Sequence, residues 1–246
     1  MDLPDFALAR FPVTFDEYLA FVNDLATRDP ALAERRLPRE DSGGELYAER
    51  DASGHWAPRY DLLVEGDARM FCPPDQVGRV PICAVDWFDA VSYTRWRSER
   101  TGVAVRLPTE AEWEKASRGP DGRFFPWGDV FDPSFCKMRD SRPGPGQPEP
   151  IGSFPLDESP YGVRDLAGGM RGWTVDVHGE LSPEAALAEP EPAPGTPRDQ
   201  SGVRAVRGGG WLYTAPVCRA AARFTAYTST RNSMFGIRLA RDLAPR

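Results

Sequence analysis

The most reactive side chains in this sequence belong to its cysteines and histidines. No two of the four cysteines form the Cys-x-x-Cys pair typical of zinc and thioredoxin-type sites, and four are too few for a disulfide scaffold. The two histidines lack the i, i+4 spacing of helical metal ligands. These residues are Cys72, Cys83, Cys136 and Cys218, with His55 and His178. Their pattern alone predicts neither a metal centre nor a disulfide framework.

A second group of residues, within the range 208–236, suits molecular recognition rather than catalysis. Aromatic side chains there offer rigid contact area, and polar side chains offer directional hydrogen bonds. The opposing interpretation is a solvated loop with aromatic residues in the core, and it is stronger for Trp211 than for Tyr213 or Tyr227. The candidate ligand-binding residues are Trp211, Tyr213, Thr214, Tyr227, Thr228, Arg231, Asn232 and Ser233.

The elements that must position these side chains begin with three helices. Thr14 with Glu17 and Thr109 with Glu112 have the spacing of capping boxes, and Asp86 is a third N-cap residue. Apolar residues follow each cap with helical spacing. The pattern predicts helices over residues 15–27, 87–100 and 110–118.

The rest of the chain has no helical periodicity. Residues 29–80 are polar and broken by Pro and Gly, which predicts a long surface excursion. The side chains expected to hold it down are Trp56, Tyr60, Leu62 and Leu63. After Phe124, weak alternation predicts short strands over residues 204–211, 218–224 and 234–241. Early helices and late irregular strands indicate an α+β fold.

Charge and hydropathy exclude two kinds of partner. Acidic residues number 37 against 30 basic residues, and the formal charge of −7 opposes binding to nucleic acid. No apolar run approaches the roughly 18 residues of a membrane helix, and from the first residues we expect no secretory signal. Sparse cysteines favour a reducing compartment, so we expect a cytoplasmic protein.

Three stretches, in their order and spacing, resemble one protein family. They are AVDWFDAVSYTRWRSERTG with VRLPTEAEWEKASRG and FFPWGD, then SPYGVRDLAGGMRGWTVD, and then VRGGGWLYTAPVCRAAAR with FGIRLAR. Residues 11–241 are similar to the formylglycine-generating enzyme and sulfatase-modifying factor family. The resemblance implies an α+β, C-type-lectin-like fold with little regular secondary structure, as a single domain over residues 1–246. The family usually has a further hairpin before the segment matching FPVT, which implies an unusual start or a domain excised from a larger protein.

The motif RLPTEAEWE is explained better by structure than by catalysis. Carboxylates at a helix start satisfy backbone donors and pair with arginine. We therefore assign to the scaffold Arg106, Glu110, Glu112 and Glu114. The same interpretation applies to Asp165, Trp173 and Asp176.

The resemblance also implies a copper-dependent oxidase with a pair of cysteines. Aligned with that motif, Cys218 matches the second cysteine, but Tyr213 stands at the first and Gly210 replaces a serine. One thiolate cannot form a bis-thiolate Cu(I) site. The remaining cysteines lie in distant loops and are expected to be out of reach, so no catalytic residue is assigned.

Two other metals in the family receive no support from this sequence. The iron-dependent sulfoxide synthases carry three histidines on an added helical domain, and we expect no such domain here. At a calcium motif of the form AGN followed by WEW, Gly169 and Gly172 replace the Asn and Glu, with Arg171 between them. Lys137 falls where an asparagine of another calcium site is expected. We therefore expect no metal and no cofactor.

These observations predict a non-catalytic ligand- or protein-binding module, such as a sensor, on this family's scaffold. Similar domains are fused to bacterial serine/threonine kinases and other signalling proteins, so the expected partner is a protein or another macromolecule. One alternative is a metal-dependent oxidoreductase of the formylglycine-generating or sulfoxide-synthase type. The other is a variable binding protein of a diversity-generating retroelement, because such proteins vary a lectin-like carboxyl-terminal surface.

Overall fold

The three capped segments form the helices that the sequence predicts. A computed structural model describes residues 3–41, 44–64, 69–144, 146–177 and 202–244. Capping boxes begin α1 (Phe15–Ala26), α4 (Trp87–Thr101) and α5 (Glu110–Arg118), and α4 ends at Gly102 with a φ of 68°. The shorter helices are α2 (Pro30–Arg35), α3 (Tyr60–Leu63), and the 3₁₀ turns η2 (Pro74–Arg79) and η4 (Ala215–Cys218).

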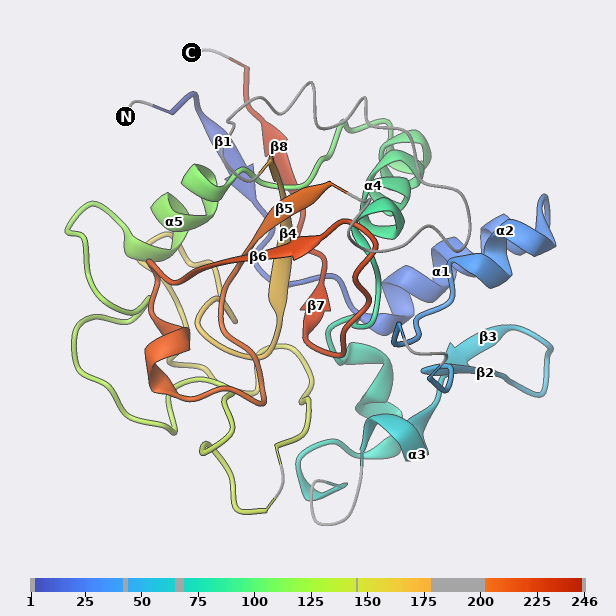
Figure 1. The fold of residues 1–246 in the computed structure, drawn as a ribbon, viewed down its shortest axis with the longest axis horizontal. Helices are drawn as coiled ribbons and strands as arrows, with labels where there is room; N and C mark the ends of the chain where they lie inside the picture. The colour runs from blue at the N-terminus through green and yellow to red at the C-terminus, as the bar shows by residue number, and fades with distance from the viewer. Residues whose placement is uncertain (1–2, 42–43, 65–68, 145, 178–201, 245–246) are drawn as a thin grey trace.

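Within the described ranges the strands form three small sheets (Figure 1). The main sheet has the order β6-β5-β4-β7, in which β4 pairs with β5 antiparallel and with β7 parallel. β1 pairs with β8 and β2 with β3, both antiparallel. The strands are β1 (Phe6–Leu8), β2 (Ala48–Arg50), β3 (Trp56–Pro58), β4 (Arg171–Val177), β5 (Val203–Arg207), β6 (Arg223–Tyr227), β7 (Phe235–Gly236) and β8 (Ala240–Asp242). The predicted α+β class, with little regular structure, is confirmed.

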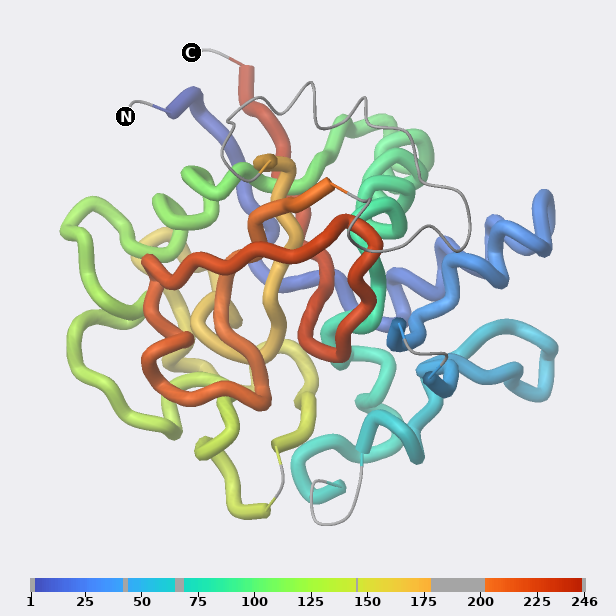
Figure 2. Tube along the Cα trace, in the orientation of Figure 1, coloured from blue at the N-terminus to red at the C-terminus, as the bar shows by residue number. Residues whose placement is uncertain are grey.

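Loops account for much of the remaining chain. Figure 2 shows the green-to-yellow stretch between α5 and β4 as a succession of loops, and this stretch packs beside the carboxyl-terminal segment around η4. Buried tryptophans connect the helices to the main sheet. Trp173 donates from Nε1 to the carbonyl of Val85 at 3.0 Å, and Trp87 donates to the carbonyl of Thr174 at 2.9 Å. The assignment of Trp173 to the scaffold agrees with this geometry.

The segment 29–80 departs from the predicted surface excursion. It contains α2, β2, β3, α3 and η2, and its side chains join the largest hydrophobic cluster. Leu37, Leu63, Val64, Cys72 and Val80 are all at most 1% exposed. These apolar residues are too widely spaced to produce a periodic signal, so their burial could not be read from the pattern.

The late strands also differ from the prediction. In the predicted strand 218–224, Cys218 ends the 3₁₀ turn η4 and strand pairing begins only at Arg223. Between them the N–H of Ala222 donates to the carbonyl of Arg219 at 2.9 Å, which closes a turn in place of a strand ladder. The missed strand β4 is buried on both faces, so it shows no alternation of apolar and polar residues. No helix in the described residues is long and apolar enough to cross a membrane.

Candidate functional site

A buried arginine lies between two aromatic rings under the predicted recognition surface. Arg171, the first residue of β4, is 5% exposed, and its guanidinium carbon lies 4.0 Å from the ring centroid of Tyr213 and 3.7 Å from that of Phe224. It also donates from Nη1 to the Tyr213 hydroxyl at 3.3 Å. No carboxylate of the described residues forms an ion pair with Arg171, and burial lowers its pKa. We call Tyr213, Arg171 and Phe224 the arginine stack.

Two departures from the family motif fit one another in this stack. A Cβ atom at Gly210 would lie 3.1 Å from Cδ2 of Tyr213, which is closer than most contacts of a real Cβ. A serine at position 210 would therefore push against the tyrosine ring. Glycine at 210 and tyrosine at 213 are thus a matched pair, and the position assigned to the first copper-binding cysteine is filled by an immobilised phenol.

The residues next to the stack form a tight turn, which we call the aromatic turn (residues 211–214). Tyr213 N–H donates to the carbonyl of Gly210 at 2.9 Å, and Trp211 Nε1 donates to the carbonyl of Ser233 at 3.2 Å. Trp211, Tyr213 and Thr214 are half-buried, whereas Leu212, between them, is 40% exposed. Leu212 was not among the predicted site residues, because an exposed leucine carries no sequence signal.

The structure does not bring all the predicted site residues together. Tyr227 is 40% exposed on β6, but strand alternation places it on the opposite face of β6 from Phe224. Asn232 accepts through Oδ1 from the Met234 N–H at 2.9 Å, and the N–H of Ser233 donates to Oε1 of Glu40 at 3.2 Å. These two residues hold the loop that approaches the aromatic turn.

Arg231 and Thr228 are directed into the protein. Arg231 donates from Nε to Asp86 at 3.1 Å, its Nη2 lies 2.7 Å from Asp89, and it also bonds two backbone carbonyls. Thr228 is 0% exposed, and its hydroxyl has no partner among the described residues. In this conformation neither side chain is available to a ligand.

The expectation that Cys136 is out of reach of Cys218 is wrong. Both cysteines are 0% exposed and pack in the same small cluster with Phe125, Met138 and Ala167. A hydrogen bond to Cys218, followed by burial, raises the pKa of the Cys136 thiol well above its ordinary value. The loop after α5 contacts the segment 209–218, where the N–H of Arg139 donates to the carbonyl of Tyr213 at 3.0 Å, and no local pattern in the sequence could have shown that contact.

The Lys137 ammonium group is buried at the position where the family's second calcium site would have an asparagine. Lys137 Nζ lies 2.8 Å from Oε1 of Glu149, and both side chains are under 10% exposed. Arg142 adds an ion pair to the other oxygen of Glu149 at 3.2 Å. Since two fixed cations already neutralise this carboxylate, the residues present do not fit a calcium ion. No group of three or more His, Cys, Asp or Glu in the described ranges could hold a metal ion.

His55 is exposed between β2 and β3 and bonds to the Ser53 hydroxyl at 2.8 Å. His178 falls outside the described residues.

The family assignment follows from a comparison of the whole chain with protein-family models. Residues 1–243 match the sulfatase-modifying factor enzyme 1-like domain. The chain belongs to this family. The resemblance of the three motif stretches is thereby confirmed over nearly the full sequence.

Relatives of this sulfatase-modifying factor domain have diverse names. Hercynine oxygenase of Mycolicibacterium smegmatis is 29% identical over 99% of this chain and 54% of its own length. Serine/threonine-protein kinase Pkn1 of Chlamydia trachomatis is 28% identical over 98% of this chain and 34% of its own. Inactive C-alpha-formylglycine-generating enzyme 2 of Bos taurus is 33% identical over 55% of this chain and 40% of its own. The chain thus spans about half of the oxygenase and a third of the kinase.

Solved structures show the same fold at low sequence identity. PvdO of Pseudomonas aeruginosa aligns with 97% of this chain and 80% of its own at a TM-score of 0.64 and 24% identity. Treponema denticola variable protein 1 aligns with 97% of this chain and 84% of its own at a TM-score of 0.62 and 17% identity. At these identities the likeness concerns the fold alone.

Proposed function

We propose that this sulfatase-modifying factor domain is a non-catalytic recognition module whose aromatic turn binds a protein partner. The observation that carries the proposal is the arginine stack. Tyr213 takes the place of a catalytic cysteine, and its ring and hydroxyl are both held by Arg171. A tyrosine that is already immobilised loses little conformational entropy when a partner covers it.

The exposed neighbour of the stack supplies the apolar contact. Leu212 is 40% exposed between Trp211 and Tyr213, so one apolar side chain projects from a rigid aromatic base. Interfaces draw most of their binding energy from a few such anchors. The relatives named as an inactive enzyme and as a kinase support a binding or sensor role within a longer protein. Four free thiols favour a cytoplasmic location for this module.

The test begins with a photo-crosslinking amino acid at position 212, which captures the partner in cells for identification by mass spectrometry. The dissociation constant of the purified partner is then measured for the wild type, Leu212→Asp and Tyr213→Ala. Leu156→Ala is the control, because Leu156 is also an exposed apolar residue and lies outside the aromatic turn. We expect at least a tenfold loss for the first two variants and less than twofold for the control. Equal binding by all four proteins would refute the proposal.

A second candidate function, metal-dependent oxidoreductase, is favoured by the buried thiol pair. Cys136 and Cys218 are hydrogen-bonded neighbours, and paired sulfur ligands select Cu(I). The raised pKa of Cys136 opposes this candidate, because thiolates are the metal-binding form.

Copper titration separates the two candidates. Cu(I) is added in the presence of a competing chelator to the wild type, Cys136→Ser, Cys218→Ser and the matched control Cys72→Ser. Stoichiometric binding that disappears only in the first two variants would establish the copper site and remove the main argument for a non-catalytic module. The recognition proposal expects no stoichiometric binding in any of them.

A further inference from the structure

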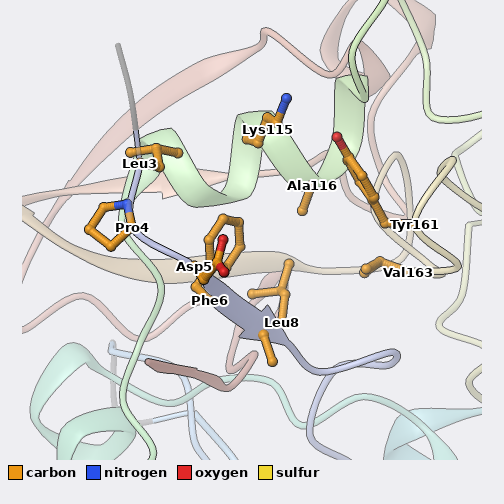
Figure 3. A pocket seen from close by; sticks show the side chains of 10 residues that line it. Leu3, Pro4, Asp5, Phe6, Leu8, Lys115, Ala116, Tyr161 and Val163 are labelled. Atoms are coloured by element: carbon orange, nitrogen blue, oxygen red, sulfur yellow. The ribbon is translucent and has the colours of Figure 1, made fainter. Parts of the chain in front are cut away.

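A groove runs along the free edge of β1, far from the aromatic turn in the sequence. Its volume is about 580 Å³, and it is lined by residues 3–8, Lys115, Ala116, Tyr161 and Val163. Figure 3 shows α5 on one side of β1, with Tyr161 on the same side of the groove as Lys115. Residues 3–5 precede β1 and residues 6–8 form it, so the groove extends along the whole of this short strand and the segment before it.

The hydrogen-bonding groups of that edge can be assigned from the strand register. The carbonyl of Asp5 accepts from Leu243 at 3.0 Å, and the N–H of Ala9 donates to Leu239 at 2.8 Å. Residues 5, 7 and 9 thus face β8, so the N–H and C=O groups of Phe6 and Leu8 face away from it. Neither group has a backbone partner elsewhere in the described residues.

The walls of the groove add an apolar face and a positive charge. Phe6 and Leu8 are half-buried against the cluster that contains Trp113 and Val163, so an apolar floor runs beside the free edge. Lys115 lies 5.9 Å from the ring centroid of the exposed Tyr161 and forms no ion pair with any described carboxylate. The unpaired Lys115 ammonium on the rim is complementary to a carboxylate, while Asp5, the other charged residue of the lining, would repel a second one.

We infer that this groove binds an extended peptide that adds a strand to β1 and places a carboxylate at Lys115. The peptide backbone bonds to Phe6 and Leu8, its alternate apolar side chains contact the floor, and an acidic side chain or carboxyl terminus meets the ammonium. A compact small molecule would not use both outward backbone pairs, which belong to residues two positions apart along the strand. Strand addition accounts for the edge, the floor and the cation together.

The experiment selects binders from a displayed library of random eight-residue peptides on the intact protein. An enriched peptide is synthesised with a fluorophore, and its dissociation constant is measured by anisotropy. Two N-methylated versions block alternate sets of amides. The inference expects one set to weaken binding at least tenfold and the other by less than threefold, because only one set faces β1.

Protein variants locate the carboxylate contact. Lys115→Glu should weaken binding at least tenfold, and Lys115→Arg should retain it. Leu212→Asp should have no effect, which separates this groove from the aromatic turn. Lys115 is one of two lysines in the chain and Lys137 is 7% exposed, so protection of Lys115 from acetylation reports occupancy directly.

Two results would overturn the inference. One is a selection that yields no peptide whose binding falls in Lys115→Glu. The other is equal weakening by both sets of N-methyl groups, because that pattern would exclude pairing along one strand edge.

Discussion

Two buried arginines on neighbouring strands are treated differently by the fold. Arg207 on β5 and Gly172, next to Arg171 on β4, are register partners. Arg207 is 2% exposed, and its guanidinium group forms ion pairs with Glu114 at 2.8 Å and Glu110 at 3.8 Å. Arg171 is 5% exposed, and its guanidinium group contacts the rings of Tyr213 and Phe224. The first arginine is neutralised by the scaffold, whereas the second keeps an uncompensated charge beneath the proposed recognition surface.

This difference separates the part of the motif that builds the fold from the part that has changed. Arg207 belongs to a network that includes the start of α5, where Arg223 also donates to Glu110 at 2.8 Å and Arg106 donates to Glu112. Every carboxylate at that helix start has a guanidinium partner. In the arginine stack, by contrast, the absence of a Cβ atom at Gly210 leaves room for the Tyr213 ring.

The largest expected effect is the loss of Arg207. Arg207→Met keeps most of the volume but leaves the largely buried Glu110 with less positive charge and frees the carbonyl of Ala220. Because Glu110 keeps Arg223 and Glu114 keeps Arg118, the expected cost is that of a lost charge-assisted hydrogen bond, about 1.5–3 kcal/mol. Urea denaturation at pH 7 should show a loss in that range in the free energy of unfolding. A loss below about 1 kcal/mol would mean that the network adds little to stability.

Arg171→Met should cost less than Arg207→Met. The variant gives up the interaction with two rings, about 2 kcal/mol for a desolvated cation, but it also removes a buried charge without a carboxylate partner. We expect a net loss below about 1.5 kcal/mol by the same urea assay. An equal loss in the free energy of unfolding for both variants would show that the difference in partners between the two arginines does not affect stability.

The sequence predicted the helices of the scaffold but not the contacts of the arginine stack. Capping boxes depend on residues three apart, so α1, α4 and α5 could be predicted within one or two residues. The contact of Arg171 with Tyr213 joins residues 42 positions apart, and nothing local encodes it. The same reason explains why the pairing of Cys136 with Cys218 was missed.

A double-mutant cycle can test whether Gly210 and Tyr213 are matched. Gly210→Ser brings a Cβ to 3.1 Å from the Tyr213 ring, and overpacking of this kind costs about 1 kcal/mol at the lower end of its range. In a Tyr213→Ala background the ring is absent, so adding the serine should cost almost nothing. The unfolding free energies of the four proteins give the coupling directly. Additive effects would show that the two departures from the motif arose independently.

The smallest effect concerns the thiols beside the arginine stack and appears only in alkali. The pKa of Cys136 is raised in the folded protein by its hydrogen bond to Cys218 and by burial. Because the folded state holds this proton more tightly than the unfolded chain, the stabilisation is complete below the ordinary thiol pKa and declines as pH rises above it. The free energy of unfolding should therefore fall from pH 7 to pH 10 more in the wild type than in Cys136→Ala. An identical pH dependence in the two proteins would contradict the proposed thiol pairing. The control is Cys72→Ala, because burial also raises the pKa of the Cys72 thiol, to about 11. This variant measures how much of the decline is common to any buried cysteine.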